Sequence, residues 1–148
     1  MATLSWGKPK VEFAPYVPLE NPTVWSELPD IKQDTAKLTT TKGSKLEALN
    51  EGGELIDSKT LKNKFNFECD IFVQKGMTRP FTDVDGQITG FWALRLTPED
   101  NEMQGWIIDR TSVSCEESWT SKEGTLLKYI FEALDPWDGN ILKSYTKP

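Results

Sequence analysis

The sequence predicts a mainly β protein: an antiparallel β-sandwich or barrel with a long protruding hairpin and at most one short helix. Runs of alternating or β-branched residues recur along the 148 residues. Turn signals separate them roughly every 8–12 residues, a spacing typical of all-β domains. The length fits one domain, and 37% apolar with 11% aromatic residues is too apolar for a disordered chain.

The first 35 residues are predicted to form an extended N-terminal arm, followed by a single β-sandwich domain over residues 36–148. Five of the nine prolines lie between residues 9 and 31. Proline fixes φ and donates no backbone hydrogen bond, so only Lys10–Phe13 is expected to be a strand there. Such an arm is long for a loop, and we expect Tyr16 and Trp25 to anchor it on a neighbouring surface.

Residues 36–75 are predicted to form a long hairpin that belongs to the sandwich domain. Its turn signals are Gly43 and Glu51-Gly52-Gly53-Glu54, and its strands are expected over residues 37–42, 45–50, 55–61 and 64–74. The last strand is the clearest, because apolar and polar residues alternate along it. The earlier strands are polar, and a polar two-stranded ribbon is marginal alone and exposes its edges. Pairing with copies of itself in a ring and lying on its own domain both remain open as remedies.

Residues 76–119 are predicted to hold an irregular stretch and then two strands. The stretch 76–90 is expected to be irregular, with a short helical turn near residues 82–84. Phe91–Thr97 is expected to be a strand, and Trp106–Trp119 one long strand or two short ones. The apolar faces of strands 64–73 and 111–119 are expected to meet in the core, where Cys69 and Cys115 would both lie. Two free buried thiols are the favoured interpretation over a disulfide.

Residues 125–134 fit both helical and strand spacing. The consecutive Tyr129, Ile130 and Phe131 favour the strand. Asp138-Gly139 is a hairpin turn signal, and Ile141–Thr146 is expected to be the returning strand. The chain is therefore predicted to hold seven to nine strands.

Composition argues against an enzyme. The chain has no histidine, which excludes Ser-His-Asp and Cys-His triads, and two cysteines alone cannot close a zinc site. Glu116 and Glu117 are neighbours on a strand, so their side chains point to opposite faces and cannot share a glycosidase site. Asp83-Val84-Asp85-Gly86 resembles the start of a calcium loop, but the twelfth residue is Leu94, so a plain turn is predicted. No cofactor and no metal are expected.

The net charge of −6 lies in one stretch. Residues 83–123 hold nine acids and three bases, which gives −6, whereas the other 107 residues hold 14 of each. This distribution argues against tight nucleic-acid binding. The N-terminus lacks the pattern of a signal peptide and no window reaches about 18 apolar residues, so we expect a protein kept in a cytoplasm and off the membrane.

Six tryptophans fall into two groups. Trp92, Trp106 and Trp119 lie in predicted strands and are expected in the core. Trp6, Trp25 and Trp137 lie in terminal or proline-flanked segments and are placed to contact a neighbouring subunit. Exposed tryptophans can also stack on sugars, so a monomeric β-sandwich that binds carbohydrate or another ligand is the alternative from a different class.

The chain resembles bacteriophage tail-tube proteins, loosely over residues 36–135. The resemblance is carried by Thr39–Ala48, Gly52–Asp57 and Phe67–Val73. It implies β-sandwich subunits that assemble into stacked hexameric rings, each lending a long hairpin to a continuous inner barrel through which DNA passes. It also implies N-terminal arms that reach neighbouring rings, and a packed helix for which only residues 76–90 or 125–134 are candidates.

The resemblance implies a non-enzymatic virion protein, assembled in the bacterial host cytoplasm. Its partners would be itself and other virion proteins, with DNA passing through the lumen without specific binding. A tube terminator or a capsid decoration protein would fit the same residues. The expected subunit contacts are Tyr16, Trp25, Lys45, Glu47, Asp57, Lys59 and Trp137.

Overall fold

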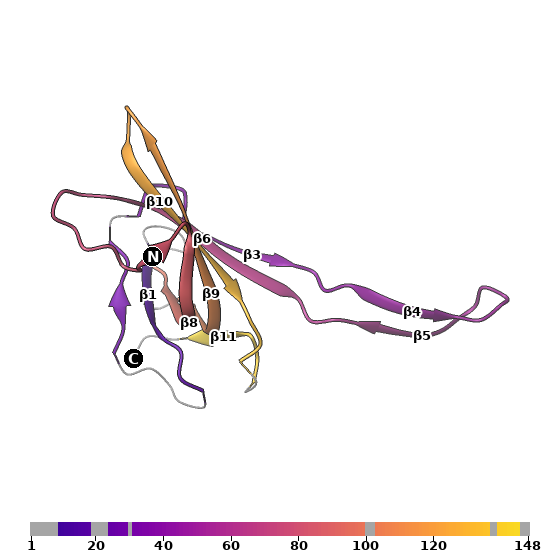
Figure 1. Cartoon of the computed structure of the whole chain (residues 1–148). Helices are drawn as coiled ribbons and strands as arrows, with labels where there is room; N and C mark the ends of the chain where they lie inside the picture. The colour runs from indigo at the N-terminus through magenta and orange to yellow at the C-terminus, as the bar shows by residue number, and fades with distance from the viewer. Residues whose placement is uncertain (1–8, 19–23, 30, 100–102, 137–138, 146–148) are drawn as a thin grey trace.

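The computed structural model describes residues 9–18, 24–29, 31–99, 103–136 and 139–145, which form eleven strands and no helix (Figure 1). The mainly β prediction is therefore confirmed, and every strand pair is antiparallel. In chain order the strands are β1 (Lys10–Pro15), β2 (Ser26–Glu27), β3 (Lys37–Thr41), β4 (Lys45–Leu49), β5 (Leu55–Thr60), β6 (Lys64–Phe72), β7 (Asp83–Val84), β8 (Gln87–Thr97), β9 (Gly105–Thr120), β10 (Gly124–Ala133) and β11 (Leu142–Tyr145). The predicted number of seven to nine strands is therefore too low: each segment expected to be a strand contains one, and the two-residue strands β2 and β7 are additional.

One large sheet has the order β2-β1-β8-β9-β10-β6-β3, with β7 beside β8 and β11 beside β9. The 16-residue β9 is its spine. The first half of β9 pairs with β11, as in Leu142 opposite Ile108, and its second half pairs with β10 from Thr111 to Thr120. β10 pairs only with the second half of β9, so the same edge of the first half is free to pair with β11. The returning strand β11 therefore pairs with β9 and not with β10.

The large sheet folds over on itself into two facing layers. Leu28 N–H donates to Val11 O of β1 at 2.9 Å, and Lys32 N–H donates to Asp70 O of β6 at 2.8 Å. Four residues span at most about 14 Å, so β1 and β6 lie close together although four strand pairings separate them in the sheet. The result is an open sandwich whose two ends are bridged by residues 28–36.

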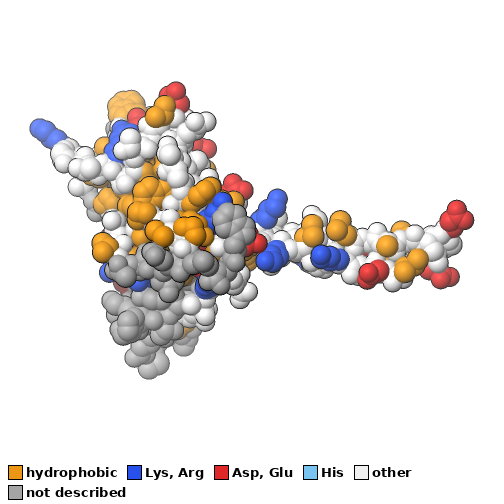
Figure 2. All heavy atoms as spheres, turned by 60° about the horizontal axis from the view of Figure 1, so that its bottom comes forward, with side chains coloured by type: hydrophobic (Ala, Val, Ile, Leu, Met, Phe, Trp, Pro, Cys, Tyr) orange, Lys and Arg blue, Asp and Glu red, His pale blue; other side chains and the backbone are white. Residues whose placement is uncertain are grey.

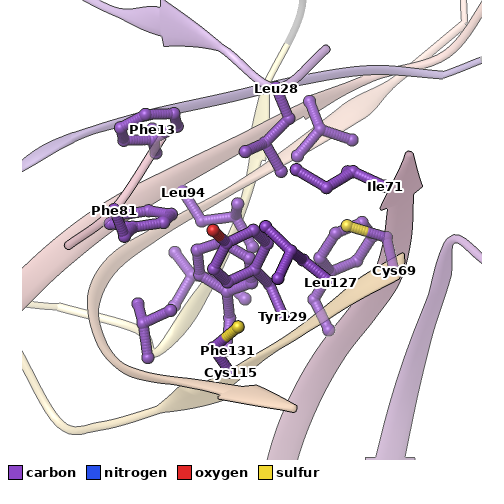
Figure 3. Packing of buried hydrophobic residues seen from close by; sticks show 14 residues of the cluster. Phe13, Leu28, Cys69, Ile71, Phe81, Leu94, Cys115, Leu127, Tyr129 and Phe131 are labelled. Atoms are coloured by element: carbon purple, nitrogen blue, oxygen red, sulfur yellow. The ribbon is translucent and has the colours of Figure 1, made fainter. Parts of the chain in front are cut away.

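Phe81 is buried in the core, beside Phe13 (Figure 3). Its ring centroid is 4.4 Å from that of Phe13, 5.2 Å from Tyr129 and 5.9 Å from Phe131. Leu127, Tyr129 and Phe131 are fully buried, so β10 keeps a period of two and the strand prediction for residues 125–134 is confirmed. Cys69 and Cys115 are both buried and unpaired, as expected.

Within residues 1–35, β1 and β2 belong to the large sheet, so these segments do not form an arm. β1 is an inner strand between β2 and β8, and Val11–Ala14 are buried one after another. Glu12 is tolerated there because Arg95 Nη2 and Nε donate to its carboxylate at 2.9 and 3.1 Å. Pro15 is the last residue of β1, where a missing backbone donor costs little.

The helical turn expected near residues 82–84 is wrong. Asp83–Val84 form β7, which turns back into β8 at Asp85 and Gly86, with φ values of 51° and 88°. Two positive φ angles define a type I′ hairpin turn, which Asp-Gly favours. The prediction of a plain turn at this motif is thus confirmed, and both helix candidates implied by the resemblance are non-helical.

The core prediction for the strand tryptophans holds only in part. Trp92 packs against the core cluster, and Trp106 lines a small apolar cavity with Leu96 and Ile108. Trp119 is instead 69% exposed, so its assignment to the core is wrong. It lies near the end of β9, where the β9–β10 hairpin projects beyond the sandwich (Figure 1).

Candidate assembly surface

The most exposed structure in the described chain is the ribbon, defined here as β4, β5 and their turn (residues 45–60). It extends away from the sandwich (Figure 1), and every residue of both strands is exposed. β4 and β5 form a two-stranded sheet of their own, so each has one edge with no strand beside it among the described residues. The protruding hairpin is therefore confirmed, and a ribbon lying on its own domain is excluded.

The ribbon is fixed firmly where it leaves the sandwich. Gly43 N–H donates to Asn63 Oδ1 at 2.9 Å, and Leu61 N–H donates to Ser44 O at 2.8 Å. A Cβ at residue 43 would lie 1.8 Å from Leu61 O, so only glycine permits this approach of the two chains. These contacts hold the ribbon in line with β3 and β6.

The free end of the ribbon is also ordered, by hydrogen bonds that converge on Asn50. The Glu54 N–H donates to Asn50 Oδ1, and the Gly53 N–H donates to Asn50 O, both at 3.0 Å. The Asn50 N–H in turn donates to Glu54 O at 3.0 Å. Gly53 adopts φ 81°, a left-handed conformation that suits glycine. The free end of the ribbon therefore has a defined conformation.

Apolar side chains are concentrated on the ribbon and its base. Of the ten exposed large apolar side chains among the described residues, five lie here, with 41–68% of their surface exposed: Leu46, Leu49, Leu55, Ile56 and Leu61. Figure 2 shows apolar side chains along the ribbon. An exposed strand edge that also carries apolar residues is a template for pairing with another chain.

The structure brings four of the predicted contact residues together on the ribbon. Lys45 pairs with Thr60 and Glu47 with Ser58 on one face, where Lys45 Nζ and Glu47 Oε1 are 3.6 Å apart. Asp57 pairs with Ala48 and Lys59 with Leu46, which places these two on the opposite face. Each face therefore presents one lysine and one acid from this set.

The predicted contact residues outside the ribbon are not part of this surface. Tyr16 is partly buried, and its hydroxyl donates to Pro136 O at 3.1 Å. Trp25 is partly buried under the Arg95 guanidinium, which lies 4.5 Å from the ring centroid. Both side chains thus pack on their own sandwich. Trp137, like Trp6, lies outside the described residues.

Sequence reasoning missed the exposed apolar residues. On the ribbon, Leu46 and Leu49 occupy alternate faces of one strand, and Leu55 and Ile56 are consecutive on the other. Apolar residues on both faces were a signal that neither face is buried by the chain itself. A similar signal existed for Trp119, because Glu117 lies two residues before it and therefore on the same face of the strand. In the structure Glu117 Oε1 lies 2.6 Å from Arg79 Nη1, and both side chains are exposed to solvent.

The described residues contain no group of three or more His, Cys, Asp or Glu side chains that could hold a metal ion. Burial raises the pKa of the Cys69 thiol to about 12 and that of the Cys115 thiol to about 11, so both stay protonated near neutral pH. No helix in this part of the chain is long and apolar enough to cross a membrane.

No protein-family model matches the chain, and no curated protein matches it.

Proposed function

We propose that this protein is a phage virion structural protein of the tail-tube type, which self-assembles into rings through its ribbon. One observation carries the proposal: a two-stranded ribbon with both faces exposed and a bare edge on each side. Such a ribbon is marginal alone. Copies arranged in a ring would supply each edge with a neighbouring strand, and closure into a barrel removes every edge.

The charge of the hairpin suits a channel through which DNA slides. Residues 45–75 hold five lysines and six acids, a net charge of −1. Tight phosphate binding needs a basic surface, so DNA would pass without specific binding. The protein would act by assembly, with itself and other virion proteins as partners. Assembly would take place in the host cytoplasm, without a cofactor or a membrane.

The ribbon and the sandwich support the proposed function, but one feature implied by the resemblance to tail-tube proteins does not. The resemblance implies a packed helix, and the described residues contain none. A tube terminator or another ring protein of the same virion would use the same ribbon, and its product would be single rings. Formation of tubes would therefore indicate a tube protein, and formation of single rings would indicate a terminator or another ring protein. Both outcomes agree with the proposed assembly through the ribbon.

Size-exclusion chromatography with negative-stain microscopy tests the proposal. The full chain is expected to form rings or tubes. A variant lacking residues 43–62 is expected to be monomeric. Its sandwich is expected to stay folded and to unfold cooperatively, because the deleted residues contribute no core side chain. Near-UV circular dichroism is the control for the fold of the deletion variant.

A full chain that stays monomeric at high concentration would overturn the proposal. A monomer that is retained on a glycan array would support the carbohydrate-binding alternative. A deletion variant that unfolds would show that the ribbon is part of the core, which would contradict its role as an assembly element.

A further inference from the structure

The ribbon, taken together with its base (residues 42–64), separates its charges completely along its length. Its root segment (residues 42–46 and 59–64) holds five lysines and no acid, and its tip segment (residues 47–58) holds four acids and no base. The root segment therefore carries +5 and the tip segment −4. Figure 2 shows the lysines gathered near the sandwich and the acids toward the free end.

Most of these charges have no counterpart in their own chain. The only ion pairs they make within the described ranges are Lys45 with Glu47, at the boundary of the two segments, and Lys62 with Asp135, both at 3.6 Å. Each such exposed pair stabilises a fold by at most about 1 kcal/mol. Complementary charges across an interface instead choose the partner and set its register. The pattern therefore points to contact with another molecule of matching polarity.

A groove beside the root segment offers a second match. It has a volume of about 250 Å³ and is lined by Lys62, Asn63, Phe65, Asn140, Ile141 and Leu142. Its walls are thus partly apolar, with a lysine among them. The tip segment has the complementary composition, because Leu49, Leu55 and Ile56 are exposed among its acids.

Two ribbons that run in the same direction at the same height would set lysine beside lysine and acid beside acid. Like charges opposed across strands are destabilising. An offset of about five residues, on the order of 15–20 Å, brings the tip segment of one ribbon beside the root segment of the next. Closure of a sheet into a barrel requires a stagger of this kind.

We propose that the tip segment of one copy docks on the root segment and its groove in a second copy, so that neighbouring ribbons are staggered. This inference rests on the proposed self-assembly and specifies its register. The molecule that binds at the root segment is a second copy of this chain. One chain supplies the basic root segment and its groove, and it also supplies the acidic tip segment with the apolar residues that fit the groove.

Charge reversal in matched sets tests the docking. The tip variant is E47K/E51K/E54K and the root variant is K59E/K62E/K64E. Each alone would set like charges against each other, so the assembled fraction in sedimentation is expected to fall at least ten-fold. An equimolar mixture restores opposite charges at every contact and is expected to assemble as the unmodified chain does.

Two control variants make the same changes of net charge at exposed positions outside the ribbon: E27K/E116K/E132K and K10E/K75E/K122E. Both controls are expected to assemble normally. If the tip and root variants each assemble alone, or if their mixture does not assemble, the docking is wrong while self-assembly of the unmodified chain still stands. A monomeric unmodified chain would overturn both proposals.

Discussion

The sandwich and the ribbon are made of the same kind of element and use their apolar residues in opposite ways. In β10, Leu127, Tyr129 and Phe131 all point into the core, while Lys128 and Glu132 lie on the other face. In β4 and β5, apolar residues occupy both faces, and none is buried. A strand with a period of two stabilises its own fold, whereas a strand without one leaves apolar surface for another molecule.

The difference places the buried core in one region and, under the proposed function, the contacts between copies in the other. Burial of an aromatic side chain contributes about 2–3 kcal/mol, and the core around Phe81 holds several of them. The ribbon stays extended because its base is fixed at Gly43 and its end at Asn50, and not because it packs on anything in its own chain. Changes to the two regions should therefore affect different measurements.

Among the changes that test the difference between the two regions, Phe131→Ala is expected to have the largest effect, on the free energy of unfolding of the sandwich. Phe131 is fully buried between Phe67 and Phe81, at centroid distances of 6.0 and 5.9 Å. Removal of its ring leaves a cavity, and we expect the free energy of unfolding to fall by about 3–5 kcal/mol. Urea denaturation of the deletion variant that lacks residues 43–62 measures this without interference from assembly.

Leu49→Ala is the matched control, measured in the full chain below the concentration at which it assembles. Leu49 is 59% exposed on the ribbon, so the free energy of unfolding is expected to change by less than about 0.5 kcal/mol. Equal losses in the two variants would mean that the ribbon contributes to the fold as the core does.

A smaller effect is expected for association, from Ile56→Thr. Ile56 is 68% exposed, and its burial against a second copy would contribute about 1–2 kcal/mol. The concentration needed for assembly, measured by light scattering, is expected to rise about ten-fold, with no change in the urea midpoint of the sandwich.

Val24→Thr controls for the loss of an exposed apolar side chain. Val24 is 78% exposed on the sandwich, away from the ribbon. If both variants weaken assembly equally, the association surface is not confined to the ribbon.

The fold could be predicted from the sequence where periodicity is strong. Residues 64–73 alternate regularly, so the strand and its buried face with Cys69 were predicted correctly. Residues 125–134 also fit a helix, and the consecutive Tyr129, Ile130 and Phe131 correctly favoured the strand. The separation of the ribbon was predicted as well, because Gly43 and the double glycine at residues 52–53 mark its bends and its strands are polar. These signals are local, which is why a single sequence carries them.

The failures depend on contacts between distant residues. Prolines suggested an arm, but Val11–Ala14 are buried by β8 and the facing layer, and the carboxylate of Glu12 is neutralised by Arg95, 83 residues away. Trp119 was placed in the core because its spacing is right. β9 continues beyond the sandwich there, and spacing along a strand does not reveal where the opposing layer ends.

Below pH 9 the thiols are expected to have the smallest effect on the contrast, because their contribution to stability changes only at higher pH. Burial raises the pKa of Cys69 to about 12 and that of Cys115 to about 11, from an ordinary value of 9. Between pH 9 and 11 the unfolded chain therefore binds fewer protons than the native one, so stability falls as pH rises, and below pH 9 this contribution is fully present. Replacing both cysteines by alanine is expected to flatten the pH dependence. Some slope remains, because burial also raises the pKa of Tyr129.

Thiol labelling compares the two regions directly. At pH 8 the native Cys69 and Cys115 are expected to resist a disulfide reagent until the protein is unfolded, since both are buried and protonated. A cysteine introduced by Ile56→Cys in the double-alanine background is expected to react at once in the monomer, and to be protected when the protein assembles. Native thiols that react as fast as this one would show that the sandwich opens readily. An engineered thiol that stays reactive in the assembled protein would place Ile56 outside the contact between copies.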